Sequence, residues 1–138
     1  MTAAEPFAMP IELGKVREFV AGTLGDVARW EEEPRVVPPT FLAVARLWQR
    51  GEHRAAPPGD PARLLHAGQR YVFHGPPPAP GDELTGRQRV SDQYTRNGRK
   101  GGLLEFTELT TDFHDPSGRL VATAVTTTVM TQNAPEGR

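Results

Sequence analysis

The sequence predicts an α+β protein in which an antiparallel sheet curls around one apolar helix. The stretch "TFLAVARLWQR" at 40–50 is apolar on most of its circumference and follows a Pro-Pro pair, so it predicts a wrapped helix. Beyond residue 66 the chain has the alternation and turn residues of strands. A chain of 138 residues suffices for one core but not for two, so we expect a single domain over 1–138 with its core at about 7–131.

The N-terminal part predicts a short strand and two helices separated by a loop. Residues 7–11 fit a short strand, and an amphipathic stripe predicts a helix over 13–24 that Gly25 ends. The apolar residues that form this stripe are Val16, Phe19, Val20 and Leu24. Residues 25–38 are charged and unpatterned, which indicates a surface loop with Glu31, Glu32 and Glu33 as a solvated face.

Four strands are predicted in the C-terminal part, over 68–74, 84–94, 103–113 and 120–131. The Asn97-Gly98 pair is typical of a two-residue type I′ hairpin turn between the second and third of them. Several aspartates lie in turns or on polar strand faces, and their simplest role is to cap backbone amides. These are Asp60, Asp82, Asp92 and Asp115.

Composition argues against several classes of partner. Sixteen basic and 17 acidic residues give a net charge of −1, so neither a nucleic-acid backbone nor a membrane is expected as a partner. The chain has no cysteine, no leader pattern at its N-terminus and no apolar run near the length of a membrane span, so we expect a cytoplasmic protein. Frequent Arg, Ala, Pro and Gly indicate a GC-rich bacterial genome.

The residues offer no familiar nucleophile or metal site. The two serines, Ser91 and Ser117, lie in a strand and a turn instead of a strand-to-helix elbow. The four histidines lack the i, i+4 helical spacing of a zinc pair, and "NGRKGG" lacks the spacing of a phosphate loop. We therefore expect no metal and no cofactor.

Three stretches in order resemble one family. They are "VPPTFLAVARLW", "LLHAGQRYVFHGPPPAPGDELTGRQRV" and "GGLLEFTELTTDFHDPSGRLVATAVTTTV", and they resemble the N-terminal-type MaoC-like dehydratase domain over about residues 7–131. This hot-dog family includes the non-catalytic subunits of mycobacterial (3R)-hydroxyacyl-carrier-protein dehydratase. The resemblance implies a hot-dog fold and a thioester of coenzyme A or acyl carrier protein as ligand. Hot-dog sheets commonly pair, so we also expect a homodimer, or a heterodimer with a catalytic MaoC-like subunit.

In catalytic members a Gly-Asp-x-Asn-Pro-x-His pattern before the helix supplies an acid-base pair that handles water and the α-proton of a 3-hydroxyacyl thioester. Aligned on Gly25-Asp26, this chain has Ala28, Arg29 and Glu31 in place of the asparagine, proline and histidine. Asp26 alone matches. It is the one catalytic candidate, and a helix-end or surface carboxylate is the alternative.

Two further positions follow from the resemblance. The family uses the start of the central helix as an oxyanion hole, and Thr40 and Phe41 match it, whereas Pro38 and Pro39 have no N–H to donate. The alternative is that Thr40 only caps the helix. His66 opens the first strand after the helix and could face the acyl or pantetheine channel; the alternative is a structural histidine.

Three functions remain open. The first is a catalytically silent, acyl-binding subunit of a (3R)-hydroxyacyl-thioester dehydratase or enoyl-thioester hydratase, with a MaoC-like partner that supplies the Asp-His pair. The second is a self-sufficient divergent dehydratase that uses Asp26; a thioesterase ranks lower because the central helix carries no acid. The third is a non-enzymatic acyl-thioester binding or scaffold protein.

Overall fold

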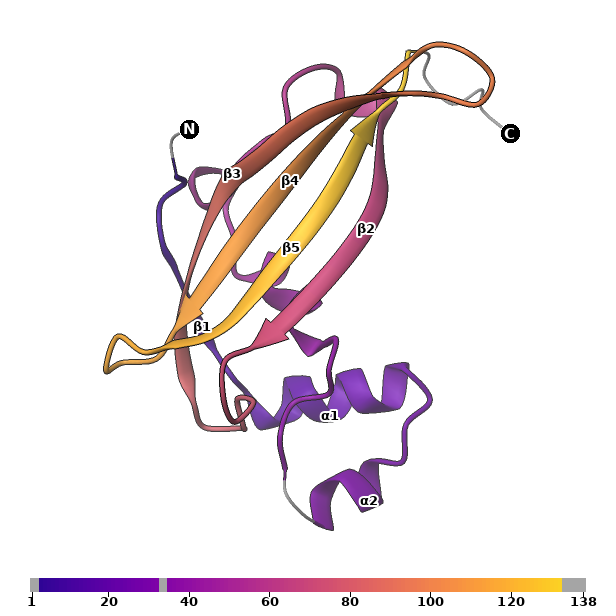
Figure 1. The fold of residues 1–138 in the computed structure, drawn as a ribbon. Helices are drawn as coiled ribbons and strands as arrows, with labels where there is room; N and C mark the ends of the chain where they lie inside the picture. The colour runs from indigo at the N-terminus through magenta and orange to yellow at the C-terminus, as the bar shows by residue number, and fades with distance from the viewer. Residues whose placement is uncertain (1–2, 33–34, 133–138) are drawn as a thin grey trace.

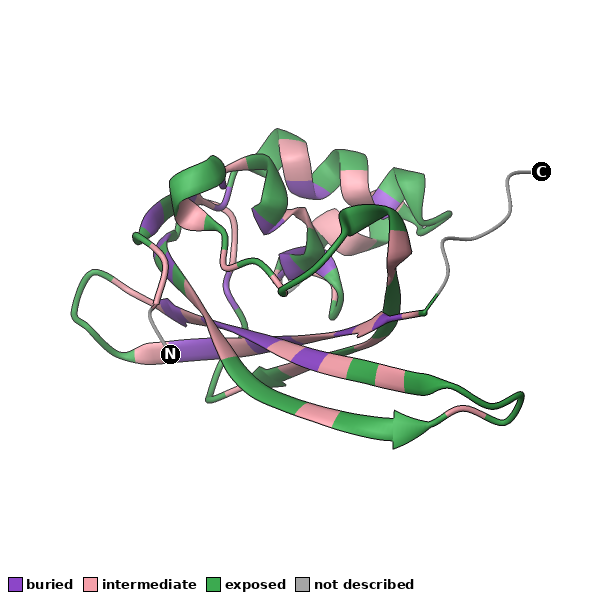
Figure 2. Ribbon diagram, turned by 90° about the horizontal axis from the view of Figure 1, so that it is seen from above, coloured by how far each residue is buried: buried purple, intermediate pink, exposed green. Residues whose placement is uncertain are grey.

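The main element is a five-stranded antiparallel sheet (Figure 1), seen in a computed structural model that describes residues 3–32 and 35–132. The strands are β1 (Phe7–Pro10), β2 (Leu64–Phe73), β3 (Glu83–Asn97), β4 (Leu103–His114) and β5 (Leu120–Met130), and their order in the sheet is β1-β3-β4-β5-β2. The helices cover only one face of this sheet (Figure 2). The predicted α+β class and the short strand at 7–11 are confirmed.

The expected long central helix is instead η1 (Phe41–Leu47), a 3-10 helix of seven residues. An apolar run without a clear period does not distinguish 3.6 from 3.0 residues per turn. Phe41 is fully buried, but Leu47 remains 68% exposed, so the segment is wrapped only at its start. Arg54 donates from Nη2 to the carbonyl oxygen of Gln49 at 2.8 Å, just beyond the end of η1.

The first helix, α1 (Leu13–Gly22), ends two residues before the predicted boundary. Gly25 N–H donates to the Val20 carbonyl at 2.8 Å and Leu24 N–H donates to the Ala21 carbonyl at 3.1 Å, which is the Schellman arrangement. Gly25 is needed because a Cβ there would lie 3.0 Å from the Val20 oxygen. Leu24 adopts a φ of 60°, the left-handed conformation that usually belongs to glycine, and is 95% exposed.

The predicted loop at 25–38 contains a short helix, α2 (Val27–Glu32). It is joined to α1 by an ion pair in which Arg17 Nη2 lies 2.5 Å from Glu31 Oε1. The charge pattern of residues 25–38 did not indicate this helix. The helix buries no residue, so it leaves no apolar stripe in the sequence, and it depends on the cap at its start and on contacts with α1. Glu31 and Glu32 are on this helix, while Glu33 lies outside the described residues.

The core lies between the helices and the nearer half of the sheet. Phe113 of β4 is fully buried and meets Phe7 edge-on, with 6.2 Å between the ring centroids. Phe7 pairs with Gly86 across β1 and β3, and a Cβ on Gly86 would lie 2.3 Å from the Phe7 ring. Glycine at 86 therefore lets the aromatic ring lie flat on the neighbouring strand.

The Asn97-Gly98 pair does not form the predicted two-residue turn. Asn97 is the last residue of β3, and residues 98–102 make the connection, with Gly98 N–H donating to the Gly102 carbonyl at 2.9 Å. The positive φ angles fall on Gly101 (81°) and Gly102 (87°). Glycine adopts this conformation at less cost than asparagine, so the longer loop is preferred where two glycines follow.

Replacement of Leu24 by glycine is expected to raise the free energy of unfolding by about 1 kcal/mol, because it removes the strain of a left-handed leucine whose side chain buries nothing. Urea unfolding followed by circular dichroism measures the change. Leu24→Ala is the matched control: it removes the same side chain but retains a Cβ at positive φ, so its stability should stay near that of the parent. Equal gains in both variants would contradict the strain argument.

Candidate functional site

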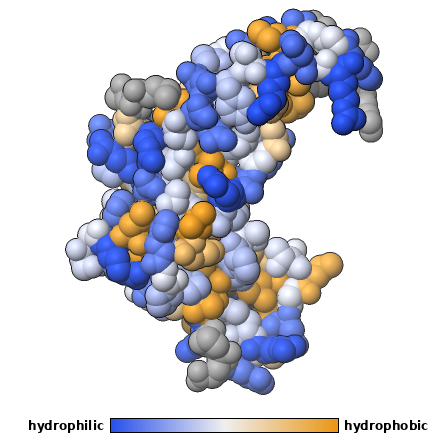
Figure 3. All heavy atoms as spheres, in the orientation of Figure 1, coloured by the Kyte–Doolittle hydropathy of each residue, from blue (hydrophilic) through white to orange (hydrophobic). Residues whose placement is uncertain are grey.

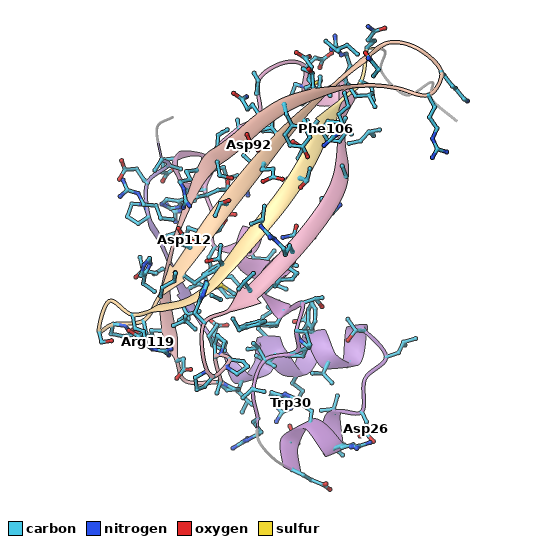
Figure 4. All side chains as sticks on the ribbon, in the orientation of Figure 1. Asp26, Trp30, Asp92, Phe106, Asp112 and Arg119 are labelled. Atoms are coloured by element: carbon cyan, nitrogen blue, oxygen red, sulfur yellow. The ribbon has the colours of Figure 1, made fainter. Side chains whose placement is uncertain are left out.

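Asp26 acts as the N-terminal cap of α2. Its Oδ1 accepts a hydrogen bond from the Arg29 N–H at 3.1 Å, and its carbonyl accepts one from the Trp30 N–H at 3.0 Å. The side chain is exposed and lies on the far side of the helical layer from the sheet (Figure 4). The geometry thus accounts for Asp26 by capping, a role that aspartate fills well at this position.

The start of η1 is held by the segment before it. Trp30 donates from Nε1 to the Val36 carbonyl at 2.7 Å, and the Val37 N–H donates to the Pro78 carbonyl at 2.8 Å. The proline-rich connection between β2 and β3 therefore supports the helix entrance. This tie explains why two distant proline stretches in the sequence meet in the fold.

Thr40 and Phe41 lie side by side at this entrance but differ in exposure. Phe41 is fully buried, its ring meets Phe19 edge-on at 5.5 Å, and its N–H donates to the Pro38 carbonyl at 3.0 Å. Thr40 is exposed and its side chain makes no capping hydrogen bond. Within the described ranges, the Thr40 and Leu42 N–H groups have no acceptor. The free donors predicted from Thr40 onward are thus present, but not at Phe41.

His66 lies near the start of β2, whose other end passes the helices (Figure 1). Its Nε2 lies 3.4 Å from Oε1 of Gln69, and the same Gln69 oxygen accepts a hydrogen bond from Thr126 at 2.8 Å. No hydrogen bond or ion pair among residues 3–32 and 35–132 joins His66 to Thr40, Phe41 or Asp26. Of the catalytic candidate Asp26 and the predicted substrate-binding residues Thr40, Phe41 and His66, only Thr40 and Phe41 are brought together, as chain neighbours at the start of η1.

A cavity of about 230 Å³ lies on the helix side of the sheet, over the half that η1 leaves uncovered. The loop before η3 (Pro61–Arg63) covers it, and Gly59 in that loop lies against Met130 of β5. Its walls combine apolar and uncharged polar side chains with one carboxylate. The lining residues include Pro57, Pro58, Leu64, Thr95, Glu105 and Met130.

His74 takes part in a chain of polar contacts that reaches a carboxylate on another strand. Thr123 donates to Oδ1 of Asp112 at 3.0 Å, so His74 Nε2, 2.9 Å from the Thr123 hydroxyl, is the donor in that contact. Nη1 of Arg89 forms an ion pair with the other oxygen of Asp112, Oδ2, at 2.5 Å. This chain crosses the helix-free face of the sheet, where cross-strand polar pairs stabilise the sheet itself.

The predicted capping role of the aspartates is confirmed. Each carboxylate accepts a backbone N–H: Asp60 from Ala62, Asp82 from Ala79, Asp92 from Gln93 and Asp115 from Ser117 and Arg119. The Ser117 hydroxyl is the main cause of the lowered pKa of Asp115. In the part of the chain that the structure describes, no group of three metal-ligating side chains occurs and no helix is long and apolar enough to cross a membrane.

The site residues that the sequence predicts do not include Tyr71. It pairs with Ala124 of β5 and packs against the core, and burial raises the pKa of its hydroxyl. The phenol therefore stays a neutral donor on the helix side of the sheet. A strand pattern places Tyr71 on a face, but only the packing reveals this environment.

Comparison with known proteins gives a consistent result. The family model for the FAS1-like, dehydratase domain region matches residues 2–124. The HadBC (3R-hydroxyacyl-ACP dehydratase) complex of Mycobacterium tuberculosis is similar with a TM-score of 0.67 and 22% identity, over 91% of this chain and 95% of that one. No curated protein matches.

Two further solved structures are similar. The ChsH1-ChsH2 complex of Mycobacterium tuberculosis has a TM-score of 0.67 and 16% identity, over 97% of this chain and 86% of that one. A MaoC-like dehydratase of Phytophthora capsici has a TM-score of 0.72 and 20% identity, over 99% of this chain but 50% of that one. These structures show the same fold, and the hot-dog architecture predicted from the sequence is confirmed.

The raised pKa of Tyr71 predicts a loss of stability at alkaline pH. A group whose pKa is higher in the folded state stabilises the fold below its unfolded pKa, about 10, and this contribution is lost as pH rises through the folded pKa. Tyr71→Phe should therefore unfold at a urea concentration that depends less on pH between about 9 and 11. The same pH dependence in both proteins would show that Tyr71 titrates without any effect of burial.

Proposed function

This chain belongs to the family of FAS1-like dehydratase domain regions, and from that premise we propose that it is the acyl-binding subunit of a (3R)-hydroxyacyl-thioester dehydratase or enoyl-thioester hydratase. A MaoC-like partner supplies the Asp-His pair. The ligand is a thioester of coenzyme A or acyl carrier protein. The observation that carries the proposal is that Asp26 caps α2 and that no histidine accompanies it in the segment before η1.

Hydration adds water to the 2,3 double bond of the acyl chain, so the enzyme must move one proton to C2 and activate the oxygen that attacks C3. That work needs an acid-base pair within hydrogen-bond reach of the substrate. Asp26 is exposed and already accepts the Arg29 N–H, and the residue at the expected histidine position is Glu31, which pairs with Arg17. Both side chains have structural partners, which favours chemistry supplied by another subunit.

The short central helix supports an acyl-binding role. Because η1 ends at Leu47, the inner face of the sheet beyond it is open enough to hold the cavity between Pro57, Pro58 and Met130. Pockets for small ligands combine apolar walls with a few polar groups, as here. The free N–H groups of Thr40 and Leu42 suit a thioester oxygen at the other end of the helix.

The free edge of β2 supports association with a partner. Among the described residues, this ten-residue strand pairs only with β5, and Leu65 and Val72 on it are 43% and 37% exposed. A long, partly apolar edge strand is a liability unless another chain covers it. The complexes HadBC and ChsH1-ChsH2 each contain two differently named subunits, and we propose a comparable assembly for this chain.

The proposal predicts that the isolated chain does not hydrate a crotonyl thioester, whereas the chain copurified with a MaoC-like partner does. Turnover is followed by loss of the enoyl thioester absorbance. Asp26→Asn in the complex should leave kcat unchanged, because the amide retains the capping oxygen. Robust turnover by the isolated chain would overturn the proposal.

Two other outcomes identify the alternative functions. Loss of turnover in Asp26→Asn, in a variant that folds normally, would identify a divergent dehydratase that uses Asp26. Tight binding of an acyl thioester without turnover in any combination of subunits would identify a binding or scaffold protein.

The cavity predicts a dependence on acyl length. Thr95→Trp places a large ring at the cavity wall and is expected to lower kcat/KM for a long-chain enoyl thioester by about tenfold or more, with little effect on the crotonyl substrate. Thr85→Trp is the matched control, since Thr85 is exposed on the same strand and faces the other side of the sheet. Equal losses for both acyl lengths would show that the cavity does not hold the chain.

A further inference from the structure

The helix-free face of the sheet carries a continuous apolar row across its four long strands. In the strand registers Tyr94 pairs with Phe106, Phe106 with Val129, and Val129 with Leu65. Side chains alternate along β4, so Phe106 faces away from the core that Phe113 enters. The Tyr94 and Phe106 rings stack with their centroids 5.0 Å apart and 7° between their planes. Figure 3 shows this face, with hydrophobic residues among hydrophilic ones.

Unbalanced charges flank this row. Asp92 and Glu108 lie directly opposite each other on β3 and β4, an arrangement of like charges that destabilises a sheet. Neither carboxylate has an ion pair among the residues that the structure describes. On the other side of the row Arg96 lies over the Tyr94 ring, with Cζ 5.4 Å from its centroid. Figure 4 labels Asp92 and Phe106, which lie on neighbouring strands.

Along β3, one face therefore presents an acidic, an aromatic and a basic residue at alternate positions 92, 94 and 96. The order acidic, aromatic, basic is complementary to itself when β3 of one copy lies over β3 of a second copy and the two strands run in opposite directions. An Asp92 carboxylate of one copy then meets Arg96 of the other, and the reverse contact forms at the same time.

We propose that this face binds a second copy of the chain, with the two sheets packed face to face around a twofold axis along the apolar row. A rotation about this axis returns the row to itself and reverses the strands, as an isologous interface requires. An axis parallel to the strands would place Asp92 opposite Gly68, which carries no charge, whereas the axis along the row places it opposite Arg96. Glu108 lies opposite an uncharged residue in both arrangements, Thr127 with the axis parallel to the strands and Leu104 with the axis along the row. Charge complementarity selects the axis along the row.

This face-to-face interface is distinct from an association through the edge of β2, in which backbone groups would form hydrogen bonds with a partner strand. The proposal does not rest on the proposed enzymatic function. If the chain also pairs with a catalytic subunit, the face-to-face contact joins two such pairs. The proposed interface places the apolar and aromatic side chains of the row along its middle line and charged side chains on either side, which is the usual anatomy of a protein interface.

Sedimentation equilibrium on the full-length chain tests the proposal. The parent chain should dimerise, and Asp92→Arg and Arg96→Asp should each weaken the dimer on the order of tenfold or more, because each variant brings like charges together. An equimolar mixture of the two variants should regain association, since the two cations of the Asp92→Arg copy then meet the two carboxylates of the Arg96→Asp copy. Arg99→Asp, the same change of charge in the β3–β4 turn, should leave the dimer intact.

Phe106→Glu should also abolish the dimer while circular dichroism shows an unchanged sheet, because the side chain is on the outer face. A monomeric parent chain would overturn the proposal, as would a dimer that none of these variants weakens, which would indicate edge pairing. A parent chain that is monomeric alone, but whose complex with a different subunit is broken by Arg96→Asp, would assign the face to that subunit and overturn pairing with a second copy.

Discussion

Burial of Phe41 between α1 and the sheet is the interaction on which the remaining features depend. Its ring meets Phe19 edge-on and excludes solvent completely, which fixes the start of η1 against the nearer half of the sheet. The hydrogen bond from Val37 to Pro78 holds the preceding segment in the same place. With its start anchored and its length limited to seven residues, η1 cannot extend over the far half of the sheet, and that half is left for a cavity.

The chemistry of the helix entrance follows from local structure as much as from residue identity. Asp26 caps a helix that lies directly against α1, and Glu31 forms an ion pair with Arg17 on that helix. The Asp26 carboxylate is thereby used in capping α2, and the Glu31 carboxylate in joining α2 to α1. Among the residues that the structure describes, the entrance has free backbone donors at Thr40 and Leu42, which is consistent with the proposed acyl-binding role.

The sheet is covered on one face, and this asymmetry separates three surfaces. The helix side holds the core and the cavity, the edge of β2 exposes unpaired backbone, and the outer face carries both a polar chain and an apolar row. On the outer face Arg89, Asp112, Thr123 and His74 satisfy one another, so that region needs no partner. Asp92 and Glu108 cannot satisfy each other in this way, because the strand register places the two carboxylates opposite each other.

The sequence alone determined the strands, the turn aspartates and the family. These features are local or depend on a period of two. Tertiary structure decided the rest. The length of η1, the formation of α2 and the five-residue turn after Asn97 depend on packing and competing glycines. The apolar row depends on register, which the bulges at Val90/Asp92 and His66/Gly68 shift by one residue, and no single strand contains that information.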